Sequence, residues 1–282
     1  MTERETLPMA AAERGARNLW MRVAAASVLA PFAIAVAYAG GWFWTVLVIF
    51  AAAGLFVEWL TVVGARTLPV MVAGIAMLSG AGWIEAVQGE AAYVVVLAGF
   101  GVAAVALLAP ARRGWAALGS FYALAALIAS LAVRLDQSWG FVALMFVLLV
   151  VWGTDIGGYF AGRSIGGPKL WPRVSPKKTW AGAIGGFLVS LALAAGFAAL
   201  GLGRTGPVLL LGGIFSIGSQ LGDLFESAVK RRFGVKDSSH IIPGHGGLMD
   251  RLDGFVAAIV LAAILGFLRG GADGVGRGIM VW

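Results

Sequence analysis

Long apolar runs separated by short polar segments make up most of the chain, and this pattern predicts membrane-spanning helices. A helix needs about 20 mostly apolar residues to cross the hydrocarbon core of a bilayer. The strict alternation typical of barrel strands is absent, so helices are the expected element. The predicted spans are 20–39, 41–63, 68–88, 91–110, 115–133, 138–161, 180–203, 206–229 and 252–270.

The composition agrees with this pattern and narrows the class of protein. Of the 282 residues, 60% are hydrophobic and only 12% are charged, whereas a soluble domain carries roughly 25% charged residues. The polar segments between the runs are too short for a separate soluble domain. We therefore expect an all-α fold, a polytopic membrane helical bundle of about nine transmembrane helices. Residues 1–19 would form a cytoplasmic N-terminal segment, and residues 20–282 a single integral-membrane domain.

The distribution of basic residues predicts which side of the membrane each polar segment faces. With the N-terminus in the cytoplasm, 17 of the 21 lysines and arginines fall on the cytoplasmic side of the predicted spans. Only Arg134, Arg204, Arg269 and Arg277 fall on the other side. Cytoplasmic segments of membrane proteins are enriched in these residues. Both long polar segments, near 162–179 and 230–251, are therefore expected to be cytoplasmic.

The first of these segments carries groups suited to phosphate binding. Asp155 lies near the end of the sixth predicted span, and the sequence "SPKKTW" follows with Ser175, Lys177, Lys178 and Thr179. Adjacent lysines flanked by hydroxyls, just before a helix begins, are suited to cradle a polyphosphate. The alternative is that the lysines only anchor the segment on the cytoplasmic side.

The eighth predicted span ends with two carboxylates and an ammonium on one helix face. Asp223, Glu226 and Lys230 are spaced at i, i+3 and i+7, which places them on the same side of a helix. An acid inside a span costs free energy unless it is compensated, so it is a candidate functional residue. A structural Glu226–Lys230 ion pair is the alternative, but it leaves Asp223 unexplained.

The second polar segment and the start of the ninth span add further polar groups. Asp250 and Asp253 share one face of the first helical turn, where acids also suit the positive end of the helix dipole. Asp253 could be a simple capping acid, and His245 a loop histidine bonded to backbone. Carboxylates without cysteine or a histidine cluster favour a hard cation such as magnesium over zinc. The segment's candidate groups are Lys236, Asp237, His245, Asp250, Arg251 and Asp253.

Acids for a divalent metal and bases for phosphoryl oxygens together indicate phosphoryl or nucleotidyl transfer at the cytoplasmic face. Chemistry at a membrane surface suggests that one substrate is a lipid. Nothing in the pattern points to nucleic acid. An ion-coupled transporter is the alternative from another class, but it predicts acids deep in several spans. Here the acids cluster at the ends of spans, apart from Glu58 and Glu85.

The polar motifs resemble those of the phosphatidate cytidylyltransferase family, also called CDP-diacylglycerol synthases. The similar stretch runs over residues 227–253, as S-x-V-K-R, then K-D, then P-x-H-G-G-L-x-D-R-L-D. The earlier segment is similar as well, through Asp155, Tyr159, the Gly162–Arg163 pair and "SPKKTW". One departure is Ala181, where the family usually has an acid. This difference removes any role for an acid at that position.

The resemblance implies a nucleotidyltransferase that converts CTP and phosphatidic acid to CDP-diacylglycerol and pyrophosphate in phospholipid biosynthesis. It further implies a homodimer in a bacterial-type inner membrane, with a catalytic domain whose active site faces the cytoplasm. Magnesium is the implied cofactor, and the resemblance leaves room for a potassium ion. The alternative within lipid chemistry is another CTP-using phosphotransferase, such as a polyprenol kinase, which would release CDP.

The same resemblance, joined to the residue chemistry above, assigns roles to individual side chains. Asp223 and Asp250 are the implied metal ligands. Lys178, Lys230 and Arg251 are expected to be catalytic, because they would neutralise charge that builds on the leaving group. The expected substrate-binding residues are Asp155, Ser175, Lys177, Thr179, Arg231, Lys236, Asp237, His245, Gly246, Gly247 and Asp253.

Overall fold

The structure, a computed structural model, describes residues 27–87, 89, 91–239 and 246–282. Eight of its helices are long and apolar enough to cross a membrane, which confirms eight of the nine predicted spans. The first predicted span lies partly outside the described residues, and its described part is a shorter apolar helix over Ser27–Ala39. The predicted N-terminal segment, residues 1–19, lies wholly outside them.

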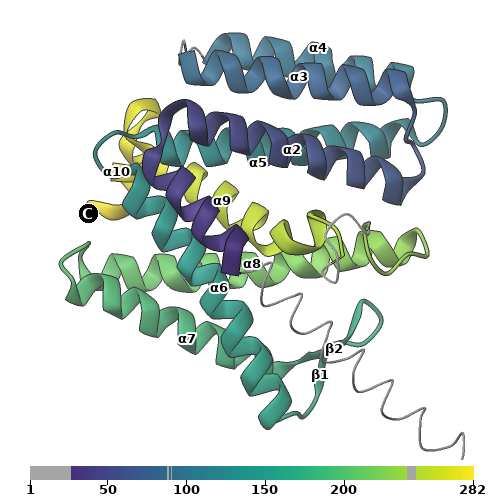
Figure 1. Cartoon of the computed structure of the whole chain (residues 1–282). Helices are drawn as coiled ribbons and strands as arrows, with labels where there is room; N and C mark the ends of the chain where they lie inside the picture. The colour runs from purple at the N-terminus through teal and green to yellow at the C-terminus, as the bar shows by residue number, and fades with distance from the viewer. Residues whose placement is uncertain (1–26, 88, 90, 240–245) are drawn as a thin grey trace, which may run out of the picture.

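The long helices pack as a layered bundle (Figure 1). Helices α3 (Leu68–Val87) and α4 (Ala91–Leu108) lie side by side at one edge, next to α2 (Gly41–Val63) and α5 (Arg113–Leu135). Helices α6 (Gly140–Ser164), α7 (Trp180–Ala199) and α8 (Thr205–Arg232) lie at the other edge, and α9 (Met249–Gly270) packs between the two groups. Helix α4 has few buried residues, so most of its apolar surface is available to lipid.

Helices α6 and α7 approach each other closely because small residues line their contact. A methyl group added at Gly186 would lie 2.5 Å from the carbonyl oxygen of Thr154. The Thr154 hydroxyl lies 2.6 Å from that of Ser190 on α7 and 2.9 Å from that of Ser216 on α8. Small residues and hydroxyl contacts of this kind hold helices together inside a membrane, where apolar burial alone gives little. These contacts fix α6, α7 and α8 relative to one another.

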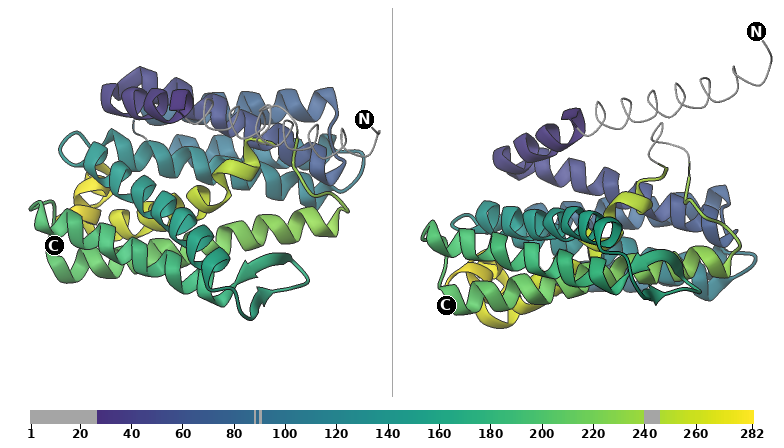
Figure 2. Two further views of the ribbon diagram at one scale, coloured as in Figure 1. Left: turned by 60° about the horizontal axis from the view of Figure 1, so that its bottom comes forward. Right: turned by 90° about the horizontal axis from the view of Figure 1, so that it is seen from below.

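A short antiparallel hairpin, β1 (Lys169–Trp171) and β2 (Ser175–Thr179), joins α6 to α7. Figure 2 shows it projecting from the ends of these two helices. Its last residue, Thr179, is the N-cap of α7, and its hydroxyl accepts a hydrogen bond from the Gly182 amide at 3.1 Å. Satisfying an amide at the start of a helix in this way stabilises the helix end. The hairpin therefore delivers Lys177 and Lys178 directly to the start of α7.

We call the end of the bundle that carries this hairpin the site end. At the opposite end, Asp136 organises the turn from α5 to α6 and the C-terminal helix α10 (Val275–Met280), which follows the short helix η1 (Ala272–Gly274). Its carboxylate accepts hydrogen bonds from the amides of Ser138 (2.9 Å), Trp139 (3.0 Å) and Arg277 (2.7 Å). Burial raises the pKa of Asp136, but these hydrogen bonds outweigh it and leave the pKa below its ordinary value.

The observed element ends differ from the predicted ones by a few residues. Helix α9 begins at Met249 rather than 252, and α8 extends to Arg232 rather than 229. Both extensions lie at the site end, where polar residues continue the helices beyond their apolar runs. The sequence pattern marks the apolar part of each helix, so it misses these polar ends.

The role of Asp136 predicts a specific loss of stability. Replacing it (Asp136→Ala) leaves the Arg277 amide without its acceptor and should cost about 1–3 kcal/mol of unfolding free energy. For a chain of this size, the apparent Tm in detergent should then fall by about 2–10 °C. Asp273→Ala is the matched control, because Asp273 is an exposed acid at the same end. Equal melting temperatures for the two variants would contradict the assignment.

Candidate active site

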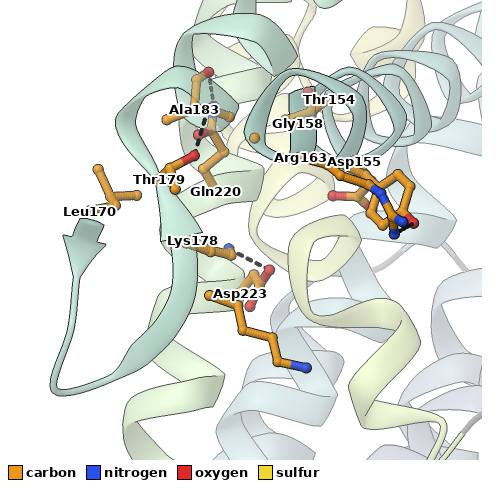
Figure 3. Close-up of a pocket in the computed structure, with 14 residues that line it drawn as sticks. Thr154, Asp155, Gly158, Arg163, Leu170, Lys178, Thr179, Ala183, Gln220 and Asp223 are labelled. Atoms are coloured by element: carbon orange, nitrogen blue, oxygen red, sulfur yellow. Dashed lines mark hydrogen bonds and ion pairs between the residues drawn. The ribbon is translucent and has the colours of Figure 1, made fainter. Parts of the chain in front are cut away.

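A cavity of about 480 Å³ opens at the site end between α6, the hairpin, α7 and α8 (Figure 3). Its wall combines cations, carboxylates, hydroxyls and bare glycine backbone, which is the chemistry expected of a site for a phosphorylated ligand. The lining residues are Thr154, Asp155, Gly158, Tyr159, Gly162, Arg163, Leu170, Lys177, Lys178, Thr179, Gly182, Ala183, Gln220 and Asp223.

An ion pair between Lys178 and Asp223 joins the two polar segments at this cavity. Lys178 comes from β2 and Asp223 from α8, and Figure 3 shows the two side chains pointing toward each other. Their side chains remain 28% and 30% exposed. Such a partly solvated pair contributes little stability by itself. Both groups are therefore accessible to a ligand that enters the cavity.

Two further carboxylates lie near Asp223 on neighbouring helices. The negative charges of Asp155 on α6 and Asp253 on α9 interact unfavourably with that of Asp223. Lys178 and Arg251 provide opposing positive charge at Asp155. Like charges held close together are unfavourable unless cations compensate them. The site end thus concentrates charge of both signs around one cavity.

Beside the cavity lies a more buried cluster of Asp250, Lys230 and Glu226, which we call the second centre. Lys230 Nζ lies 2.5 Å from Asp250 Oδ1 and 2.8 Å from Glu226 Oε1. The other Asp250 oxygen, Oδ2, accepts hydrogen bonds from the amides of Ser238 and Gly247, both at 2.9 Å. The Glu226–Lys230 ion pair, which was the structural alternative for these residues, is therefore present, and Lys230 also bridges α8 to α9. A buried cation between two carboxylates is stable only while both partners stay in place.

The turn before α9 lies tightly against this centre, which explains its glycines. Gly246 has a φ of +85°, a conformation that side chains with a Cβ rarely adopt. A methyl group added at Gly247 would lie 1.9 Å from the Ser238 hydroxyl. The described partners of this turn are Ser238 and Asp250, and the expected role of Gly246 and Gly247 in binding substrate stays a prediction.

The structure brings together some of the predicted site residues and leaves others apart. Those in the cavity wall are Asp155, Lys177, Lys178, Thr179 and Asp223. Lys230, Asp250, Asp253, Gly246 and Gly247 lie in or next to the second centre, and Arg251 adds its charge at Asp155. Ser175 begins β2, whereas Arg231, Lys236 and Asp237 are exposed near the end of α8. His245 lies outside the described residues.

Three residues in or behind the site were not among the predicted ones. Gln220 lines the cavity one turn before Asp223 and donates to the Ala183 carbonyl at 3.3 Å. Arg163 lines it too and donates to the Tyr159 hydroxyl at 3.1 Å. Glu58 binds the turn before α9 through hydrogen bonds described below. An amide or an acid inside an apolar span was the available signal for Gln220 and Glu58.

The carboxylates of Asp223 and Asp250 are of the kind that binds magnesium. The described residues contain no group of three histidine, cysteine or acidic side chains arranged to hold a metal ion. Magnesium does not require such a cage, because it usually binds one or two carboxylates together with substrate phosphates and water. Asp223 offers a partly exposed carboxylate to the cavity. Asp250 as a ligand stays a prediction, since a metal would have to replace one of its present donors.

Comparison with known proteins places these features in a family. The sequence pattern of the cytidylyltransferase family matches residues 20–268. The phosphatidate cytidylyltransferase of Brucella suis is 41% identical over 261 residues, which cover 88% of this chain and 93% of that protein. The enzyme of the same name from Bacillus subtilis is 47% identical over 125 residues, or 44% of this chain and 46% of its own length. The chain belongs to the cytidylyltransferase family.

Proposed function

We propose that this protein is a phosphatidate cytidylyltransferase, which joins CTP and phosphatidic acid to form CDP-diacylglycerol and pyrophosphate. The observation that carries the proposal is the cavity at the ends of long apolar helices, where Lys178 and Asp223 meet. A site in this position can receive a water-soluble nucleotide and a lipid headgroup together. The names of the related proteins support the same reaction.

In this reaction an oxygen of the phosphatidate phosphate attacks the α-phosphorus of CTP. A new P–O–P linkage forms, the bond from the α-phosphorus to the bridging oxygen of the β-phosphate breaks, and pyrophosphate leaves with the electron pair. A phosphate monoester has a second pKa of about 6, so it is largely a dianion at neutral pH. The attacking oxygen therefore needs no general base from the protein.

The residues of the cavity would bind the phosphates and neutralise their charge. Lys177 and Lys178 stand at the cavity wall, where they would bind phosphoryl oxygens, and Arg251 adds positive charge nearby. Lys230 is only 9% exposed between its two carboxylates, so its contribution would be to hold Asp250 and to add charge behind the cavity. Such preorganised charges stabilise a transition state because they need not reorient.

Magnesium is part of this proposal, with Asp223 and Asp250 as the residues that would hold it. Bound there, the ion would neutralise negative charge on the nucleotide phosphates. A potassium ion in the same site stays a prediction from the resemblance. We also propose a homodimer in the inner membrane of a bacterium, with the site end facing the cytoplasm, as the family resemblance and the basic residues at that end suggest.

The reaction is tested with the purified chain in detergent, phosphatidate and CTP labelled at either the α- or the γ-phosphorus. We expect the α-label to enter the lipid product and the γ-label to leave as pyrophosphate. A lipid kinase would instead transfer the γ-label to the lipid acceptor and release CDP. Transfer of the γ-label, or no transfer of either label to phosphatidate, would refute the proposed reaction.

Removing the carboxylate of Asp223 tests the metal assignment. Asp223→Asn should lower kcat at saturating magnesium by at least about a hundredfold, because a charge that organises the phosphates is lost. Chelation of magnesium should abolish turnover of the unchanged protein, and added magnesium should restore it. Asp273→Asn is the control, since Asp273 is an exposed acid at the opposite end. Near-normal turnover by the Asp223 variant would remove Asp223 from the proposed metal site.

Cysteine labelling tests the orientation, because the chain contains no cysteine of its own. Single cysteines replacing Arg173 in the hairpin and Lys236 after α8 are expected to react from the cytoplasmic side only. A cysteine replacing Asp273 is expected to react from the opposite side. All three positions are exposed, so accessibility to a membrane-impermeant thiol reagent reports the side directly. Labelling of positions 173 and 236 from different sides would contradict a common cytoplasmic site.

A further inference from the structure

Glu58 is an acid on the apolar helix α2, and its carboxylate is held by four donors from the other half of the chain. It is 1% exposed. Its Oε1 accepts from the Ser239 hydroxyl (2.6 Å) and the Leu248 amide (2.9 Å). Its Oε2 accepts from the Ser238 hydroxyl (2.9 Å) and the Met249 amide (2.7 Å). These partners lie 180 to 191 residues away in the sequence.

Two of these contacts make Glu58 the cap of α9. The first amides of a helix have no acceptor within the helix and need one from elsewhere. The residue that precedes α9, Leu248, provides no side-chain cap. Glu58 accepts from the amides of Leu248 and Met249 instead, and a carboxylate at this position also suits the helix dipole. The start of α9 is thus fixed by a side chain from α2.

The remaining contacts connect Glu58 to Asp250. The Ser238 hydroxyl lies 2.9 Å from Glu58 Oε2 and also 2.9 Å from Asp250 Oδ2. The Gly247 amide donates to Asp250, and a methyl group at Gly247 would lie 2.5 Å from Glu58 Oε2. Glu58 and Asp250 therefore both bind Ser238 and the turn before α9. Loss of Glu58 would remove the contacts that hold Ser238 and the turn at Gly247, both of which donate to Asp250.

We propose that Glu58 is a positioning residue of the active site, a role that rests on the proposed cytidylyltransferase function. It does not line the cavity, so it acts through other residues. By fixing the turn before α9, it keeps Asp250 in contact with Lys230 and sets the start of the helix that carries Arg251 and Asp253. The polar motifs that resemble the family lie after residue 150, yet their geometry depends on a side chain from the N-terminal half.

Glu58→Gln tests the proposal, because it keeps the size of the side chain but replaces one acceptor oxygen by an NH₂ donor. Hydrogen exchange in the peptide covering 246–252 should accelerate, since Leu248 and Met249 donate to different oxygens of Glu58 and one of the two amides then faces an NH₂ group instead of an acceptor. The kcat should fall about 10- to 100-fold, the scale of a misplaced catalytic group, while the Km for CTP changes less than about threefold. Glu85→Gln is the matched control, a partly buried acid of α3 near the opposite end. It should change neither quantity.

The Glu58→Asp variant provides a second measurement if Glu58→Gln does not fold. It keeps a carboxylate but shortens the side chain. The local exchange rate and kcat should therefore be intermediate between those of the unchanged protein and those of Glu58→Gln. A packing defect would instead accelerate exchange in several helices. Normal kcat, normal local exchange or a general loss of protection in the folded variants would overturn the proposal. If the unchanged protein transfers no cytidylyl group, the proposed function fails, and exchange alone still tests the contact.

Discussion

The Lys178–Asp223 ion pair is the contact at which the two polar segments of the chain meet in one cavity. Ionised groups beside a bilayer are costly unless each has a partner or a ligand. This pair connects a hairpin that follows α6 with a carboxylate on α8, so two segments distant in sequence share one cavity. The hydroxyl contacts of Thr154, Ser190 and Ser216 fix the three helices behind it.

The charged groups divide into an accessible set and a buried set, and the two sets suit different tasks. Lys178 and Asp223 are partly exposed to the cavity, where an arriving ligand can exchange partners with them. Lys230 and Glu226 are buried, with Asp250 beside them, and their contacts keep α8 and α9 in register. Glu58 extends the buried set to α2. Partly exposed contacts thus line the cavity, while buried contacts lie behind it.

The long helices could be predicted because an apolar run of membrane-spanning length is a strong and local signal. The cavity residues Asp155 and Asp223 could be predicted because an acid in or at the end of an apolar span is uncommon, and Lys178 because adjacent lysines flanked by hydroxyls precede a helix. The hairpin could not, since its strands are short and contain lysines, Pro172 directly follows β1 and Pro176 lies within β2, all of which weaken a strand pattern. The role of Glu58 was equally hidden, because its partners lie in distant parts of the sequence. Only the folded structure shows that these distant residues contact Glu58.

The meeting of the hairpin with α8 can be measured directly in the membrane. With Lys178→Cys and Asp223→Cys in this cysteine-free chain, a short bifunctional thiol reagent should link the two positions efficiently. The pair Lys178→Cys and Asp273→Cys should not be linked, because Asp273 lies at the opposite end of the bundle. Mass spectrometry of the digested protein identifies the joined peptides. Absence of a link between 178 and 223, with both cysteines reactive toward a simple thiol reagent, would contradict a single shared site.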